Sequence, residues 1–412
     1  MLHMSEKKID ELEVAEKPVK KASARKSSKK AEEKTEAVVA AVAEEKKPAK
    51  KTAAKKAAAE AAAEEKKPAK KTTRKSVKKE EPEIMVEIIE EPAVEISAPE
   101  LMEEPVMDTP RRSVVFIGSE CYPFVKTGGL GDVMYALPKV LVQQNCDVKV
   151  IIPNYKCIPE KFKEKMVFKG SFDMDLCSDG RSFYVGIMEY VEDGVVYDFI
   201  DNEEFFTNGK PYTTIVDDIP KFCYFSKAAL AALNYLDWTP DVVHCHDWQA
   251  ALIPVYLKTL FAGTKLGRSK SILTIHNLRF QGIYNTGTLK YWSGLPDDVM
   301  YSIDVLKQGQ DDANMMKGGL AYADMITTVS ETYAGEIQTE FYGENLDAHL
   351  RYHAGKLRGI VNGIDYDIWN PATDSRLAVP YDISNVIEKK TANKLALQER
   401  LGLTQDASKY VM

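Results

Sequence analysis

The stretch KTGGLGDV, Lys126 to Val133, places two adjacent glycines and a lysine at the start of a helix-like run. Gly128 and Gly129 let the backbone approach a ligand closely and adopt φ > 0. The helix that follows offers free N–H groups and the positive end of its dipole, and Lys126 adds a point charge, so the stretch could bind a phosphate. It is neither a GxGxxG fingerprint nor a Walker loop, however. Its spacing alone fits a plain strand-to-helix turn equally well.

A second polar cluster, HCHD, ends an apolar run. His244 and His246 are two residues apart, so on a strand they point to the same face, as zinc ligands can. No third ligand of a suitable type is near in sequence and Cys245 faces the other way, which disfavours a metal. Asp247 has two compatible interpretations, as a polar group of a ligand site and as the N-cap of a helix that begins near Trp248.

His276 and Asn277 end a third apolar run, SILTIHN. A lone histidine in such a place is more often a structural residue than a catalytic one. Three strands that each end in polar residues nevertheless form a constellation typical of a binding cleft.

These residues need a scaffold that brings the ends of separate strands together. From Arg111 onward, strand and helix patterns alternate. Strands are predicted at 113–120, 147–155, 241–247, 271–277, 325–330 and 357–363, and helices at 132–144, 219–236, 248–260 and 331–342. The first helix is expected to carry one apolar face, made of Val133, Leu137, Val140 and Leu141.

Period-two runs at 166–175, 181–191 and 194–201 predict antiparallel hairpins within this alternation. The predicted fold class is therefore α/β, with a Rossmann-like doubly wound parallel sheet. Ligands of such sheets bind at the carboxyl ends of the strands, where the three polar clusters lie.

Residues 1–110 have a different composition, rich in Lys, Glu, Ala and Pro with hardly an aromatic residue, and EEKKPAKKT occurs in them twice. Such a segment cannot bury enough apolar surface to offset its ordering entropy, so a disordered tail is predicted. A polycationic arm for nucleic acid is the alternative. Interspersed glutamates and the lack of base-stacking aromatics disfavour it.

The chain has 412 residues, a net charge of −7 and six cysteines without a CxxC pair. This cysteine usage is typical of reduced thiols in the cytosol. No run reaches the roughly eighteen apolar residues of a membrane span, and the N-terminus has neither the apolar region of a signal peptide nor the acid-poor composition of a transit peptide. A cytoplasmic protein without a membrane partner is expected.

Five segments together carry a family resemblance: SECYPFVKTGGLGDV, PDVVHCHDWQAALIPVYL, TIHNLRFQGIY, AYADMITTVSETYAGEI and GIVNGIDYDIWNPATD. Their order and separations closely resemble the N-terminal domain of bacterial glycogen synthases and plant starch synthases, from Ser113 to about Leu403. That family consists of retaining glucosyltransferases with a B-type fold of two Rossmann domains. Its members transfer glucose from ADP-glucose to the non-reducing end of an α-1,4-glucan such as glycogen.

The resemblance implies an acceptor-side catalytic domain at 111–370, followed at 371–412 by an inter-domain segment and the start of the donor domain. It also implies two catalytic residues. Asp247 matches the active-site acid, and His276 matches a histidine whose backbone carbonyl is thought to face the anomeric carbon and stabilise an oxocarbenium-like state.

The resemblance assigns binding roles to five further residues: Lys126, Gly128, Gly129, Asn277 and Asn362. The first three are implied to contact the nucleotide-sugar near its pyrophosphate, and the two asparagines to line the sugar cleft. No metal and no cofactor are implied, because ADP-glucose is a substrate and cationic side chains take the place of magnesium.

In one respect the sequence departs from the family. The C-terminal Rossmann domain of the family supplies an Arg and a Lys in an SRL…QKG motif and a Glu in an EPCGL-like motif, whereas this chain stops at ASKYVM, which we expect to lie in the first strand of that domain. A C-terminally truncated fragment that does not turn over ADP-glucose by itself is therefore expected. UDP-glucose also stays open as the donor, because the base-reading pocket belongs to that domain.

Two other functions compete with a synthase. One is a non-catalytic glucan-binding or regulatory module that keeps the fold. The other is an adaptor that binds polyanions through the Lys-rich tail.

Overall fold

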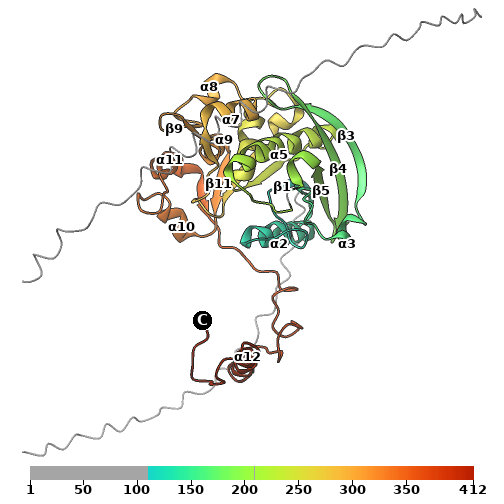
Figure 1. Ribbon diagram of the computed structural model, residues 1–412, viewed down its shortest axis with the longest axis vertical. Coiled ribbons are helices and arrows are strands. Elements are labelled where there is room, and N and C mark those ends of the chain that lie inside the picture. The colour runs from blue at the N-terminus through green and yellow to red at the C-terminus, as the bar shows by residue number, and fades with distance from the viewer. Residues whose placement is uncertain (1–109, 208) are drawn as a thin grey trace, which may run out of the picture. The chain divides into compact units, whose positions relative to one another are not determined.

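The computed structural model describes residues 110–207 and 209–412, which all belong to one compact unit. The predictions of a disordered tail and of a polycationic arm lie outside the described residues. This unit contains two sheets with helices around them, followed in the chain by a C-terminal segment that includes α12 (Val386–Arg400) (Figure 1).

The strands are β1 (Arg112–Ile117), β2 (Cys146–Pro153), β3 (Val167–Asp175), β4 (Ser182–Glu192), β5 (Val195–Asp201), β6 (Val242–His246), β7 (Lys270–Ile275), β8 (Ile283–Asn285), β9 (Lys307–Gln308), β10 (Asp312–Asn314), β11 (Met325–Thr328) and β12 (Leu357–Gly359). The α-helices are α2 (Gly129–Gln143), α3 (Glu160–Lys163), α4 (Glu203–Phe206), α5 (Ile215–Tyr235), α6 (Leu252–Lys258), α7 (Thr286–Ser293), α8 (Asp297–Met300), α9 (Met315–Tyr322), α10 (Glu331–Glu336), α11 (Asp347–Tyr352) and α12 (Val386–Arg400). Short 3-10 helices are η1 (Trp248–Ala250), η2 (Lys265–Arg268) and η3 (Ala354–Lys356).

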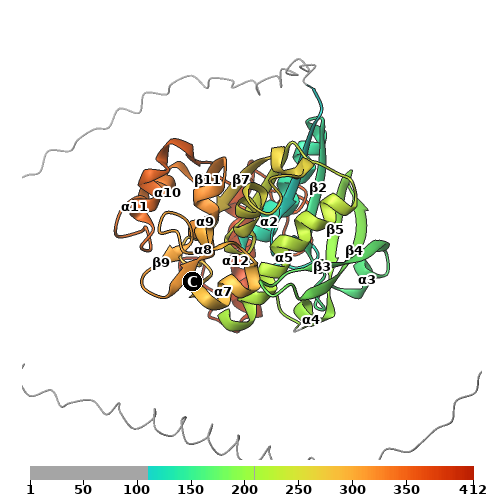
Figure 2. The same cartoon turned by 90° about the horizontal axis from the view of Figure 1, so that it is seen from above.

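The main sheet has the strand order β12-β11-β7-β6-β1-β2-β5-β4-β3 in the described part of the chain. Strands β12 to β5 in this order are parallel, and β4 and β3 add antiparallel hairpins at one end. Viewed from above, β3, β4 and β5 lie toward one end of the sheet and β7 and β11 toward the other (Figure 2). The predicted α/β class with a mainly parallel sheet is confirmed, as are the hairpins.

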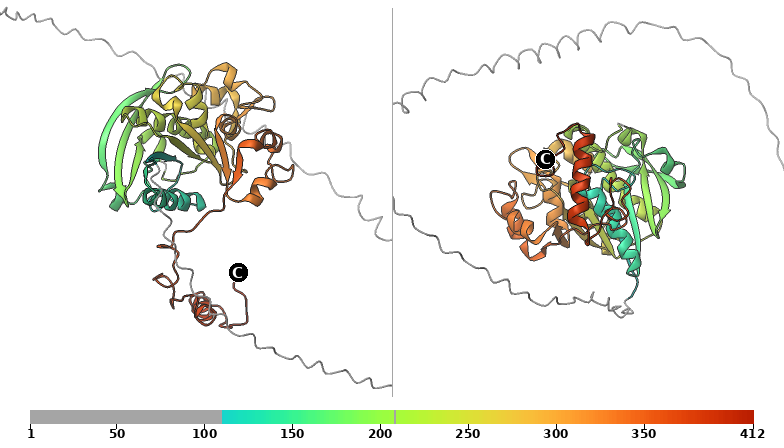
Figure 3. Two further views of the ribbon diagram at one scale, coloured as in Figure 1. Left: turned by 180° about the vertical axis from the view of Figure 1, so that it is seen from behind. Right: turned by 90° about the horizontal axis from the view of Figure 1, so that it is seen from below.

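Helices cover both faces of this sheet, as a doubly wound fold requires. Helix α2 packs against β2 on one side, while on the other α6 contacts both α5 and α9 (Figures 1 and 3). Helix α5 is buried around most of its circumference, including Phe222, Phe225 and Leu230, because it lies between the sheet and α7.

The parallel register brings three strand ends to one edge. Phe116 of β1 is paired with His244 of β6, and His246 of β6 is paired with Thr274 of β7. The residues that follow these strands therefore meet at the carboxyl edge of the sheet, which is where the sequence placed the polar clusters.

The prediction for the apolar face of the first helix is wrong. Leu137 and Val140 are exposed, and the buried face is made by Leu130, Met134 and Pro138. The helix begins at Gly129, three residues earlier than predicted, so Leu130 joins its first turn and the i, i+4, i+8 series faces the sheet.

Two predicted helices are shorter in the structure. The one expected at 248–260 divides into η1 and α6, and the one expected at 331–342 ends at Glu336. After that residue the backbone changes to i to i+3 bonds, from the N–H of Thr339 to the carbonyl of Glu336 and from that of Gln338 to that of Gly335. Bonds of this kind tighten and end an α-helix. The strand expected at the end of the chain is not seen, because residues 404–412 lie in turns and irregular backbone.

All six cysteines are free thiols, and Cys121, Cys177, Cys223 and Cys245 are buried, as expected of small apolar side chains. Cys157 is exposed, which departs from that expectation. None of the helices in the described residues is long and apolar enough to cross a membrane.

Candidate active site

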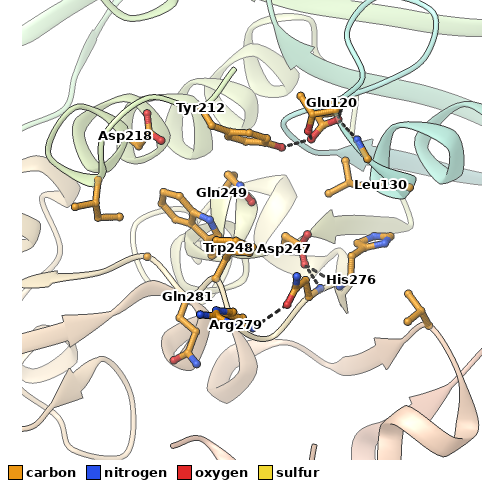
Figure 4. Close-up of a pocket in the computed structure, with 18 of the residues that line it drawn as sticks. Glu120, Leu130, Tyr212, Asp218, Asp247, Trp248, Gln249, His276, Arg279 and Gln281 are labelled. Atoms are coloured by element: carbon orange, nitrogen blue, oxygen red, sulfur yellow. Dashed lines mark hydrogen bonds between the residues drawn. The ribbon is translucent and has the colours of Figure 1, made fainter. Parts of the chain in front are cut away.

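A cavity of about 910 Å³ opens at the carboxyl ends of β1, β6 and β7 (Figure 4). Its wall combines carboxylates, amides, a histidine and aromatic rings. The residues that line it are Glu120, Thr127, Gly128, Gly129, Leu130, Tyr212, Thr213, Ile215, Asp218, Asp247, Trp248, Gln249, His276, Asn277, Arg279, Phe280, Gln281, Gly282, Ile283, Val329 and Asn362. Six of the seven predicted site residues are in this wall, and Lys126 is not.

The glycine-rich loop contributes its two glycines to the wall. Gly128 is the N-cap of α2 with φ −152°, and Gly129 is the first residue of that helix, so neither adopts the positive φ that the sequence analysis expected. A Cβ added at either position would meet no atom within 4 Å. The loop therefore does not need glycine for its own conformation or packing, and the absent side chains leave open space beside the cavity.

The side chain of Glu120 fixes this loop through hydrogen bonds, a role that was not predicted from the sequence. Its carboxylate is almost fully buried and accepts hydrogen bonds from the backbone N–H of Thr127, from the Thr127 hydroxyl at 2.7 Å, from the N–H of Gly128 at 3.3 Å and from the Tyr212 hydroxyl (Figure 4). Ser119 also bonds the Tyr212 hydroxyl, at 2.8 Å. The Gly128 N–H, predicted to face a pyrophosphate, is thus engaged by an internal carboxylate. The only sequence signal was the position of Glu120 at the end of the predicted strand 113–120.

Lys126 does not line the cavity but contacts neighbouring side chains. Its Nζ donates to Asp132 Oδ1 at 2.7 Å and lies 5.6 Å from the centre of the Trp369 ring. Both partners of the ion pair are about one third exposed, so the contact is a surface pair that a stronger anionic partner can replace.

Asp247 lies at the centre of the site with an unusual backbone, φ 56° and ψ −174°. Asp247 occupies the N-cap position of η1, as predicted, but its carboxylate makes no capping hydrogen bond to that helix. Instead, Oδ1 accepts hydrogen bonds from the backbone N–H of His276 at 2.7 Å and from that of Asn277 at 3.4 Å. A non-glycine residue in this region costs about 1–3 kcal/mol, so the surrounding contacts must hold it there.

Burial raises the pKa of Asp247 to about 7, against the two backbone hydrogen bonds, which lower it, and together with the nearby charge of Glu120, which raises it. Burial also lowers the pKa of His276 to about 4, so its imidazole is neutral near pH 7. A carboxyl group that titrates near neutrality can take up or release a proton under working conditions.

The polar neighbours of these two residues complete the strand ends. His276 is hydrogen-bonded to His246 through the ring nitrogens at 2.9 Å, and Asn277 Oδ1 accepts from the backbone N–H of Arg279 at 3.1 Å. Asn362, which comes from beyond β12, reaches the same cavity, as the resemblance implied.

The HxH pair lies among hydrogen-bonded neighbours. His244 and His246 share one face of β6, with ring centroids 4.3 Å apart, as predicted. His244 Nε2, however, is hydrogen-bonded to the Thr274 hydroxyl at 2.6 Å. Within residues 110–207 and 209–412, no group of three or more His, Cys, Asp or Glu side chains is placed to hold a metal ion.

Several wall residues had no individual signal in the sequence. Trp248 and Gln249 follow Asp247 and are almost fully buried, and Gln249 Oε1 has no hydrogen-bond partner among the described residues. Tyr212 and Asp218 come from the segment before and within α5, far from the motifs in sequence. Aromatic faces beside amides and carboxylates, with the unpaired Gln249 oxygen among them, suit a ligand that carries many hydroxyl groups.

Fold and site define an α/β protein with a Rossmann-like, mainly parallel sheet and a polar cleft at its carboxyl edge. Residues 113–352 match the family described as "Starch synthase catalytic domain", and the chain belongs to that family.

Relatives of known sequence agree with this assignment. The chain is 51% identical over 302 residues to the glycogen synthase of Lachnospira eligens and 45% identical over 302 residues to that of Lachnoclostridium phytofermentans. Each alignment covers 73% of this chain and 62% of the relative, so the chain spans about three fifths of the length of these relatives.

A solved structure resembles the fold as well. The catalytic domain of starch synthase IV from Arabidopsis thaliana, bound to ADP and acarbose, superposes with a TM-score of 0.64 and 33% sequence identity. The match covers 73% of this chain and 61% of that one.

Proposed function

We propose that this polypeptide provides the acceptor-side cleft of a glycogen or starch synthase. The reaction is the transfer of glucose from ADP-glucose to the non-reducing end of an α-1,4-glucan, with retention of configuration, in glycogen biosynthesis. The observation that carries this proposal is the cavity at the carboxyl edge of the sheet, where Asp247, His276, Asn277, Asn362 and the glycine loop meet. Membership of the starch synthase family and the names of the relatives support it.

In the proposed reaction the bond between the anomeric carbon and the ADP oxygen breaks, and a bond to the 4-hydroxyl oxygen of the glucan forms. The electron pair leaves with ADP, and the hydroxyl proton is released. Charge accumulates on the departing diphosphate, so donors that face it lower the barrier. The free N–H groups at the start of α2 are suited to this. Because the Gly128 N–H already donates to Glu120, the N–H of Gly129 is the amide proposed to face the diphosphate.

Lys126 supplies the positive charge for the diphosphate in this proposal. For that purpose its side chain exchanges Asp132 for the ligand, which costs little because the ion pair is partly exposed. We propose no cofactor, since ADP-glucose is consumed as a substrate and cationic side chains neutralise its diphosphate. A cytoplasmic location, where such a soluble donor is available, also belongs to the proposal.

Asp247 orients the backbone that faces the sugar. Its carboxylate bonds the N–H of Asn277, and in a trans peptide the carbonyl of the preceding His276 points in the opposite direction. That carbonyl is the group proposed to stabilise positive charge at the anomeric carbon. The asparagine side chains of Asn277 and Asn362 are proposed to bind sugar hydroxyls.

Binding and transfer by the 412-residue polypeptide test the proposal separately. We expect calorimetry to show that the polypeptide binds maltoheptaose and ADP-glucose. The Asp247→Ala variant should bind maltoheptaose more weakly. If the polypeptide binds neither ligand, the proposal is wrong. Transfer of labelled glucose to glycogen is measured in parallel with ADP-glucose and UDP-glucose. Our expectation from the sequence is no transfer by this polypeptide alone, and glucan binding without any donor binding would favour a non-catalytic glucan-binding module.

A further inference from the structure

His246 lies behind the cavity wall, in hydrogen-bond contact with a residue that lines it. Nδ1 of His246 and Nε2 of His276 are 2.9 Å apart, and the two rings come from the ends of neighbouring parallel strands, β6 and β7. His276 lines the cavity, whereas His246 is fully buried and does not line it. Any influence of His246 on a ligand must therefore pass through His276.

The ring of His246 is held in one orientation by its neighbours. Phe116 of β1 stacks on it, with ring centroids 5.7 Å apart and an interplanar angle of 19°, and the His244 ring lies 4.3 Å away. At Gly118, a Cβ would come within 3.4 Å of the His246 Cβ, so the backbone of the first strand end is also close. Because its neighbours pack against it, the ring cannot rotate to form a hydrogen bond with a group other than His276.

The two rings share a single proton at their contact. Burial lowers the pKa of His246 well below its usual value and that of His276 to about 4, so both imidazoles are neutral near pH 7. Of the two facing nitrogens, one must then donate and the other accept. The arrangement has two versions, which differ in the nitrogen that carries the hydrogen on each ring.

The surroundings of the two outer nitrogens favour one version. Nε2 of His246 is buried and has no partner among the described residues. If it carried the hydrogen, the fold would bury an unpaired N–H donor, which is rarer in proteins than a buried acceptor left unpaired. Nδ1 of His276 has no partner among the described residues either, but its residue borders the cavity and tolerates a hydrogen or a lone pair there. The hydrogen at the contact therefore belongs to His246 Nδ1.

We propose that His246 is a positioning residue that fixes His276 as the Nδ1–H tautomer, so that His276 presents an N–H donor to the cavity. With Nε2 engaged as an acceptor, the ring of His276 can donate to an oxygen of a bound ligand but cannot accept a proton from it through Nδ1. The contribution of His246 to the proposed glucosyl transfer rests on the proposed function, whereas the tautomer itself does not.

The test is the ring-nitrogen spectrum of the ligand-free polypeptide, labelled with ¹⁵N at its histidine rings. The chain contains only six histidines, so single substitutions assign the signals. We expect His276 to be protonated at Nδ1 and bare at Nε2, in about tenfold excess over the other tautomer, the ratio that one unsatisfied buried group produces. Protonated Nε2 on His276 would overturn the proposal.

Variants separate positioning from packing. His246→Phe keeps a ring but removes the donor, so the tautomer excess at His276 should fall to roughly threefold or less. His246→Asn places an amide donor near the position of Nδ1 and should restore the excess. The matched control His349→Gln changes a partly buried histidine of α11, which bonds the Lys317 carbonyl and packs on His353. This histidine has no ring contact or hydrogen bond with His246 or His276, so its substitution should leave the signals of His276 unchanged. An unchanged His276 spectrum in His246→Phe would also overturn the proposal.

These spectra require neither donor nor glucan. A polypeptide that fails to bind ADP-glucose or maltoheptaose would contradict the proposed function and leave the tautomer assignment intact. Conversely, an unprotonated Nδ1 on His276 in a polypeptide that binds both ligands would contradict the role of His246 and leave the proposed function intact.

Discussion

The carboxylate of Asp247 accepts a hydrogen bond of 2.7 Å from the backbone N–H of His276, so the side chain of one strand end holds the main chain of the next. The same oxygen lies 3.4 Å from the N–H of Asn277. These contacts offset the cost of the positive φ at Asp247, because a residue in a neighbouring strand end fixes its side chain. The proposed catalytic acid is thus also the group that shapes the backbone around the proposed catalytic carbonyl.

Replacing Asp247 by Asn should flatten part of the pH dependence of stability. The pKa of Asp247 is raised to about 7 in the folded protein, while an unfolded aspartate titrates near 3.9. Between these values the folded state holds one proton more than the unfolded state, so the free energy of unfolding falls as the pH rises, by up to about 1.4 kcal/mol per pH unit. Asn keeps an acceptor oxygen for His276 and does not titrate.

The measurement is urea unfolding of wild type and Asp247→Asn between pH 4.5 and 8. The buried histidines contribute the opposite slope below pH 6.5 in both proteins, because their folded-state pKa values are lowered, so only the difference between the two curves is interpreted. That difference should favour wild type increasingly as the pH falls. Parallel curves would mean that Asp247 is ionised throughout.

Gly128→Ala and Gly129→Ala should separate a ligand role of the glycine loop from a structural one. Neither residue has positive φ, and an added Cβ meets no atom within 4 Å. The free energy of unfolding should therefore change by less than about 1 kcal/mol. A methyl group in the space beside the cavity should instead weaken ADP-glucose binding, about tenfold or more, by keeping the diphosphate from the amides. If both variants bound ADP-glucose as tightly as wild type, the loop would be a structural turn and not part of the diphosphate site.

Lys126→Ala should raise the KM for ADP-glucose, or its Kd where the polypeptide binds without turnover, by about tenfold, because a hydrogen bond to a charged group is lost. The effect should shrink at high salt, since the charge is partly exposed. Lys165→Ala, an exposed lysine outside the cavity wall, is the control and should have no effect. A donor affinity that does not change in Lys126→Ala would remove the diphosphate assignment.

The sequence located the strand ends well because buried parallel strands are apolar runs with sharp polar ends. His246, Asp247, His276 and Asn277 all followed from this pattern, and the sheet order then brings them together. The pattern could not predict which neighbour each polar side chain contacts. The side chain of Asp247 bonds the next strand end rather than its own helix, and nothing local in the sequence distinguishes the two.

Glu120 and Tyr212 could not be found from sequence, because their partnership joins residues 92 positions apart. Spacing rules describe neighbours within one element, and this contact depends on how the segment before α5 crosses the sheet edge. The partner of Lys126 was also not evident from sequence. Its side chain pairs with Asp132 on the first turn of α2, where the helix dipole that attracts anions also favours an acidic side chain.

Glu120→Gln should destabilise the protein by about 2 kcal/mol or more. One carboxylate oxygen accepts from the hydroxyls of Thr127 and Tyr212, and the other from the N–H groups of Thr127 and Gly128. An amide provides only one acceptor oxygen. With that oxygen on the two N–H groups, its NH2 group can donate to the two hydroxyls, but hydrogen bonds to a charged acceptor become neutral ones, each worth about 1 kcal/mol less. Glu164→Gln, on the surface, should stay within about 0.5 kcal/mol of wild type.

Chemical unfolding of both variants measures this difference, and Tyr212→Phe adds a second test. Removal of the phenol leaves the Glu120 carboxylate with one donor fewer and leaves the Ser119 hydroxyl without its partner, so a smaller loss, about 1 kcal/mol, is expected. If Glu120→Gln were as stable as Glu164→Gln, the carboxylate would not be holding the loop.

Gly282→Ala should be the most damaging of the glycine substitutions near the cavity. Gly282 has φ +63°, which costs an alanine about 1–2 kcal/mol, and an added Cβ would overlap the indole ring of Trp248 in the cavity wall. Relief of that overlap must move Trp248, which is almost fully buried, so the free energy of unfolding and the tryptophan fluorescence should both change. Gly335→Ala, inside α10 with open space at its Cβ, is the matched control, and it should stabilise the protein by about 0.5–1 kcal/mol. Equal stabilities of the two variants would show that Trp248 can shift without a cost in the free energy of unfolding, so that its packing does not fix the cavity wall.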